Sequence, residues 1–156
     1  MILNSELTQK IIGYAMEVHT KPGPGLLEST YKECLYYKIV KSGFYVEKEK
    51  PMRLIYEDVI LECGYRMDLL KDNQLVIEIK SVEALNDIHM AQVLTYMKLG
   101  NYNLGLLLNF NVVHFKNGIR RVVNDKPLFF LPRSKEEVTW RFTEISLRDF
   151  CASSLG

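Results

Sequence analysis

Three segments of the chain repeat apolar residues at the spacing of an α-helix. Ser5 is a suitable N-cap for the first segment, and two prolines and two glycines in residues 21–25 oppose its continuation. Gly43 suits the end of the second helix, and Asn86 or Asp87 suits the start of the third. The pattern predicts helices at about residues 6–19, 26–41 and 87–99.

Extended segments lie between and after these helices. Pro51 interrupts the first of them, which indicates an edge strand or a bend. Residues 104–110 are continuously apolar, as in the centre of a sheet, and Asn117-Gly118 is a strong signal for a two-residue hairpin turn. From Lys126 onward the pattern weakens, and residues 136–150 fit either a strand or an amphipathic helix. The predicted strands are residues 44–56, 59–70, 75–80, 104–110, 112–116 and 119–123.

The element order α-α-β-β-β-α-β-β-β predicts an α/β (α+β) fold, with a mixed β-sheet flanked by helices. The strand, helix and strand between residues 75 and 110 are expected to form a right-handed crossover, the connection that joins parallel strands. At 156 residues, the chain is expected to form a single domain, 1–156. Its core covers about residues 5–124, and residues 125–156 are an extension of unclear role.

Two charged residues, Glu78 and Lys80, interrupt an otherwise apolar strand. Burial of such charges is costly unless they are paired or bind a metal. Strand alternation places Asp68 and Leu70 on one face and Met67 on the other. If residues 72–74 form the turn, Asp68 falls opposite Glu78, whereas a slip of one residue would separate them.

Asp68 and Glu78 together supply the hard oxygen ligands that suit Mg²⁺ or Mn²⁺. The backbone carbonyl of Ile79 is a further candidate ligand. The Lys80 ammonium is placed to stabilise developing negative charge, or to act as a base if burial lowers its pKa. The structural alternative is a cross-strand salt bridge from either acid to Lys80 or Arg66 on a solvated face.

The two helices beside these strands each carry polar residues on one line. Glu28 shares a helix face with the apolar Tyr31, although an acid in a first turn also favours the helix dipole. On the third helix, Gln92 and Tyr96 follow His89 at helical spacing. We expect His89 at the helix start or behind the site rather than as a metal ligand.

Asp68, followed after a hairpin by Glu78-Ile79-Lys80, resembles the D…(D/E)xK signature of the PD-(D/E)xK nuclease-like superfamily. Met67 stands where proline often precedes the aspartate. Residues 25–31, GLLESTY, resemble the motif of the GxxExxY family, a mostly bacterial group within that superfamily. Residues 64–68, 86–92 and 105–111 also resemble that family, in the expected order, and the resemblance covers about residues 5–124.

This resemblance implies a restriction-endonuclease-like core and a Mg²⁺-dependent nuclease that hydrolyses phosphodiester bonds in DNA, or in RNA, by metal-activated water. By position, it implies that Glu28 helps to hold the metal or its water, and that Asp68 and Glu78 are the metal-binding acids. It further implies that Lys80 is the catalytic lysine and that Gln92 is a polar residue pointing into the site. A homodimer is one expected arrangement, because many nucleases of this kind pair to cut both strands.

Composition narrows these expectations. The formal net charge of +1 argues against a protein held on DNA by bulk charge alone. The three cysteines are widely spaced, and no signal-peptide pattern or membrane-spanning apolar run is found, so we expect a cytoplasmic protein without membrane attachment. Two alternatives remain: a catalytically inactive nucleic-acid-binding or assembly module on the same fold, and an unrelated metal-assisted hydrolase.

Overall fold

The computed structural model describes residues 2–124, with the side chains of residues 6–62 and 64–124. Its centre is a five-stranded mixed sheet in the order β1-β2-β3-β4-β5. β3 and β4 are parallel, as the predicted crossover requires, and the other neighbouring pairs are antiparallel. The strands are β1 (Val46–Tyr56), β2 (Val59–Lys71), β3 (Leu75–Lys80), β4 (Leu104–Asn109) and β5 (Ile119–Val123).

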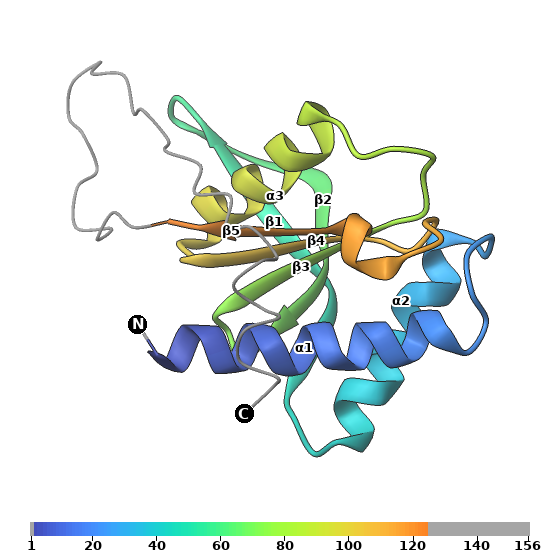
Figure 1. The fold of residues 1–156 in the computed structure, drawn as a ribbon. Coiled ribbons are helices and arrows are strands. Elements are labelled where there is room, and N and C mark those ends of the chain that lie inside the picture. The colour runs from blue at the N-terminus through green and yellow to red at the C-terminus, as the bar shows by residue number, and fades with distance from the viewer. Residues whose placement is uncertain (1, 125–156) are drawn as a thin grey trace.

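Helices cover both faces of this sheet (Figure 1). α1 (Ile2–Thr20) and α2 (Glu28–Lys41) pack on one face, through a cluster that includes Ile11, Leu35 and Ile77. α3 (Asp87–Gly100) packs on the opposite face. The predicted class, a mixed sheet flanked by helices, is confirmed. None of the helices in the described residues is long and apolar enough to cross a membrane.

The caps of α3 agree with the sequence. The Asn86 side chain accepts the His89 N–H at 3.1 Å, and the His89 ring accepts the Asn86 N–H at 3.2 Å. This capping box satisfies two N–H groups that the helix cannot pair internally. At the other end, Asn101 adopts a left-handed conformation with φ 60°. His89 is therefore a helix-start residue.

The starts of the first two helices differ from the prediction. α1 begins at Ile2, so Ser5 lies inside its first turn and is not the N-cap; nothing in the preceding residues prevents helix formation. α2 begins at Glu28 rather than residue 26, because Leu27 is extended and precedes the first helical turn. The prediction for residues 136–150 lies outside the described residues.

The predicted hairpin around Asn117-Gly118 is wrong. Residues Phe115–Gly118 form a 3₁₀ turn (η1), and β5 pairs with β4 instead of with residues 112–116. Phe115 is buried against Phe110, with ring centroids 4.8 Å apart. Tertiary packing of this aromatic side chain therefore outweighs the local turn signal.

Pro51 lies in β1, an edge strand, as predicted. Across from it, β2 does not keep simple alternation, because Met67 joins Leu70 in the cluster under α3 rather than Leu69 in the cluster under α1 and α2. The irregularity coincides with Glu49 of β1, which has φ 52°. The sheet is distorted at the position of Asp68.

Candidate active site

β2 and β3 pair in the register that brings Asp68 and Glu78 together. Leu69 pairs with Ile77 and Lys71 with Leu75, and residues 72–74 form the turn, as predicted. The regular pairing ends at Leu69, and the same register continued by one residue sets Asp68 beside Glu78. The two acids thus lie where β2 and β3 stop exchanging ladder hydrogen bonds.

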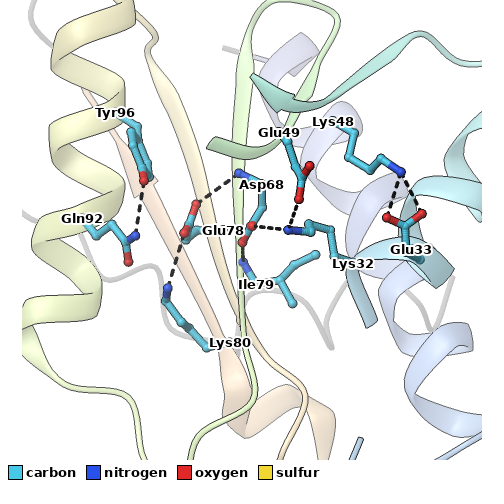
Figure 2. Close-up of polar contacts among 10 residues, drawn as sticks. All are labelled: Lys32, Glu33, Lys48, Glu49, Asp68, Glu78, Ile79, Lys80, Gln92 and Tyr96. Atoms are coloured by element: carbon cyan, nitrogen blue, oxygen red, sulfur yellow. Dashed lines mark hydrogen bonds and ion pairs between the residues drawn. The ribbon is translucent and has the colours of Figure 1, made fainter. Parts of the chain in front are cut away.

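Each of these carboxylates binds the backbone of the opposite strand (Figure 2). Asp68 Oδ2 accepts the Ile79 N–H at 2.8 Å, and Glu78 Oε2 faces the Asp68 N–H at 3.5 Å. The Asp68 carboxylate oxygen therefore takes the place of a β2 backbone carbonyl as the partner of the Ile79 N–H. These contacts hold each carboxylate against the backbone of the opposite strand.

The group is buried. Asp68, Glu78 and Lys80 are each less than a tenth exposed. Lys80 Nζ lies 3.4 Å from Glu78 Oε1, so an acid does pair with Lys80, but the pair is buried and lies within β3 rather than across strands on a solvated face. Burial, followed by the nearby charge of Asp68, raises the pKa of Glu78 to about 8. The two acids thus lie close together in a poorly hydrated place.

A second lysine, Lys32 of α2, also reaches the group. Its Nζ lies 3.2 Å from Asp68 Oδ1 and 2.9 Å from Glu49 Oε1. Sequence reasoning missed Lys32 and Glu49. One sequence feature could have identified Lys32: it follows Glu28 by four residues, so the two side chains share one face of the helix.

α3 contributes polar side chains from the other side of the sheet. Figure 2 shows Gln92 and Tyr96 directed from α3 toward Glu78 and Lys80. Gln92 Nε2 donates to the Tyr96 hydroxyl at 3.3 Å. Burial, and then the charges of Glu78 and Asp68, raise the pKa of Tyr96. Gln92 thus lies beside the site, and Tyr96 lines it while also packing in the core.

The segment GLLESTY builds the turn before α2. The Tyr31 hydroxyl donates to the Gly23 carbonyl and accepts the Leu26 N–H, while the Tyr31 ring stacks on Phe110 at 4.5 Å. Gly25 has φ 102°, a conformation that favours glycine. The Leu26 carbonyl accepts from Ser81, the residue after Lys80, at 2.7 Å. This turn is therefore fixed to the end of β3.

Glu28, the first residue of α2, is half-buried. Among the side chains of residues 6–62 and 64–124, no group of three or more from histidine, cysteine, aspartate or glutamate could hold a metal ion. The structure therefore brings Asp68, Glu78 and Lys80 together, with Gln92 beside them, but does not gather Glu28 into one metal-binding group with the two acids.

The donor set at the end of the ladder suits a hard divalent cation. Asp68 and Glu78 provide carboxylate oxygens. The N–H and C=O of one strand residue point toward the same neighbouring strand, so the Ile79 carbonyl is directed to the side on which the Ile79 N–H meets Asp68. A cation there would offset the repulsion between the two carboxylates, which together with burial, the larger cause, raises the pKa of Glu78. The residues present therefore fit Mg²⁺ or Mn²⁺.

The described part of the chain is an α+β domain whose mixed sheet carries two acids and a lysine where the β2–β3 pairing ends. The sequence model of the PD-(D/E)XK nuclease superfamily matches residues 5–122, which is most of the 156-residue chain. The chain therefore belongs to the PD-(D/E)XK nuclease superfamily, whose members generally use divalent metal ions. Comparison with curated proteins and with solved structures found no match.

Proposed function

We propose that this protein is a nuclease that uses Mg²⁺ or Mn²⁺ to hydrolyse phosphodiester bonds, with DNA as the first substrate to test and RNA as the second. The observation that supports it is the burial of Asp68, Glu78 and Lys80 together at the end of the β2–β3 ladder. Burying charged groups costs folding free energy. A buried cluster of them is therefore expected at a functional site, where the reaction uses them.

The roles follow from position. A divalent ion would polarise the phosphodiester and lower the pKa of the attacking water. Asp68, Glu78 and the Ile79 carbonyl would hold this ion, and Glu28 would take part only through water because it is not gathered with them. The Lys80 ammonium would stabilise the negative charge that phosphorus oxygens gain as water attacks.

Three further parts of the proposal go beyond membership of the superfamily: the group within it, the role of Gln92 and the pairing of chains. The run GLLESTY and its role in the turn before α2 support placement in the GxxExxY group. Gln92 would orient the phosphate or water from α3. A pair of chains would serve to cut both strands of a duplex, and sedimentation of the purified protein with and without DNA tests this arrangement.

Cleavage assays test the chemistry. Purified protein is incubated with plasmid DNA, single-stranded DNA and RNA, with Mg²⁺, with Mn²⁺ or with EDTA. We expect metal-dependent cleavage that Asp68→Asn, Glu78→Gln and Lys80→Met each reduce by about 100-fold or more. Glu62→Gln is the matched control, because Glu62 lies on the same strand as Asp68 with a side chain 77% exposed. Cleavage that persists in all three site variants would contradict the proposal.

A second candidate is a nuclease-fold module that binds nucleic acid without cutting it. It is favoured by one observation: each acid already has a lysine beside it, Lys32 at Asp68 and Lys80 at Glu78. For this candidate, DNA binding should fall steeply with salt and be indifferent to Mg²⁺ and to Asp68→Asn. Binding that strengthens with Mg²⁺ only when Asp68 is intact would favour the nuclease.

A further inference from the structure

Lys32 is held by two carboxylates from two strands. Its Nζ lies 2.9 Å from Glu49 of β1 and 3.2 Å from Asp68 of β2 (Figure 2). The side chains of Lys32 and Asp68 are 13% and 11% exposed, whereas that of Glu49 is 48% exposed. The ammonium therefore bridges a buried acid of the candidate site and a more exposed acid at its border.

This bridge engages the remaining oxygen of Asp68. Oδ2 accepts the Ile79 N–H, and Oδ1 faces Lys32. A divalent cation bound to Asp68 would find a lysine charge already at that carboxylate, and like charges so close together repel in a poorly solvated place. Ion binding and the Lys32–Asp68 contact should therefore oppose each other.

Glu49 would still bind the Lys32 ammonium after a cation displaced it from Asp68. It contacts Lys32 in the same arrangement, so Lys32 keeps one acidic partner when its contact with Asp68 is weakened. Glu49 has φ 52°, a strained backbone conformation for this residue type, at the point of β1 that faces Asp68. The unusual backbone conformation of Glu49 thus lies where its side chain meets Lys32.

We propose that Lys32 is a built-in counter-ion of Asp68 that competes with the divalent cation, and that Glu49 retains the ammonium when the cation binds. This inference rests on the proposed metal-dependent function. In this proposal, α2 lowers the metal affinity of the site through Lys32, an effect separate from those of the two acids and Lys80.

The measurement is the dissociation constant for Mn²⁺, by calorimetry and by loss of the free-ion electron paramagnetic resonance signal. Lys32→Met removes the charge and keeps most of the side-chain length, so Mn²⁺ affinity should rise about fivefold or more. Lys32→Gln should give the same direction, and it serves if the methionine variant folds poorly. Glu49→Gln should lower Mn²⁺ affinity, because the ammonium then has only Asp68 as a partner.

Two controls separate this mechanism from a general change in charge. Lys48 pairs with Glu33 at 2.8 Å on neighbouring parts of β1 and α2, so Lys48→Met makes the same charge change outside the site (Figure 2). It should leave the Mn²⁺ constant within about twofold. In the double variant Lys32→Met/Glu49→Gln, the effect of Glu49→Gln should largely vanish, because Glu49 acts through Lys32.

The outcomes are distinct. Mn²⁺ binding that is unchanged or weaker in both Lys32 variants overturns the counter-ion role and leaves the proposed nuclease standing. An undiminished effect of Glu49→Gln in the double variant overturns the part assigned to Glu49. Absence of Mn²⁺ binding in the wild type and in every variant overturns both this inference and the metal-dependent function.

Discussion

The side-chain amide of Asn109 binds both backbone polar groups of Val82. Its Oδ1 accepts the Val82 N–H at 3.1 Å, and its Nδ2 donates to the Val82 carbonyl at 2.9 Å. Asn109 pairs with Lys80 in the parallel β3–β4 register, and the Lys80 carbonyl accepts the Phe110 N–H at 2.9 Å. One side chain thus extends the strand pairing beyond Lys80 and fixes the chain that leaves it.

Replacing Asn109 with alanine should loosen this end of β3. Asn109 is 1% exposed, so the substitution leaves backbone groups of Val82 without partners in a poorly hydrated place. We expect the free energy of unfolding in urea to fall by about 2–3 kcal/mol, and metal-dependent cleavage to fall as Lys80 loses its position. Asn111→Ala is the matched control, because only the backbone N–H of Asn111 contacts Asn109. Equal stability of the two variants would contradict the role of the amide.

Glu78 should make the metal-free protein less stable as the pH rises. Its pKa of about 8 in the folded protein lies above the ordinary value of 4.5, so the folded state binds this proton more tightly than the unfolded state. The resulting stabilisation is fully present below about pH 4.5 and is lost as the pH rises through about 8. Its size is on the order of a few kcal/mol.

Urea unfolding in EDTA between pH 5 and 9 measures this effect, with Glu78→Gln and Glu62→Gln compared at each pH. Glu78→Gln should flatten the decline in stability, because glutamine cannot lose the proton. Glu62→Gln should keep the wild-type slope, since that side chain is 77% exposed. A wild-type stability that rises over this range would contradict a protonated Glu78.

The centre of the site was predictable from the sequence. Charged residues in an apolar strand identified Glu78 and Lys80. A turn at the polar residues 72–74 was the condition for setting Asp68 opposite Glu78, and the observed register meets that condition. Local signals of this kind are sufficient where a short turn joins the strands. The start and end of α3 were predictable for the same reason.

Contacts between distant elements were not predictable. Helical spacing places Lys32 on the face of Glu28, but it does not reveal how α2 crosses the sheet, which is what brings Lys32 to Asp68 and leaves Glu28 apart. The left-handed Glu49 has no signal in a strand pattern. The turn at Asn117-Gly118 failed as a hairpin because packing of Phe115, a non-local effect, determines the path of residues 112–118.

Gly118→Ala should test whether residues 112–118 follow the path seen in the structure. A Cβ at Gly118 would lie 2.1 Å from the Asn109 carbonyl oxygen, so the backbone of β4 or of η1 would have to shift. We expect a loss of about 1–3 kcal/mol in the free energy of unfolding. Gly13→Ala is the control of opposite sign: its Cβ meets nothing within 4 Å in α1, and alanine favours the helix by about 1 kcal/mol. Equal effects of the two substitutions would rule out the close approach of Gly118 to Asn109.

Tyr31→Phe should distinguish the contribution of the turn before α2 to stability from that of the core beneath it. The variant keeps the ring that stacks on Phe110, but it removes the hydroxyl that binds Gly23 and Leu26. We expect a loss of about 1–2 kcal/mol in unfolding free energy, with faster amide hydrogen exchange at Leu26. Tyr37→Phe on the same helix should change neither, because Tyr37 is 64% exposed.

The same Tyr31→Phe variant should also affect cleavage. The Leu26 carbonyl accepts from Ser81 beside Lys80, so cleavage should fall by more than the loss of folded protein explains. Cleavage that tracks only the folded fraction would show that the turn does not position Lys80.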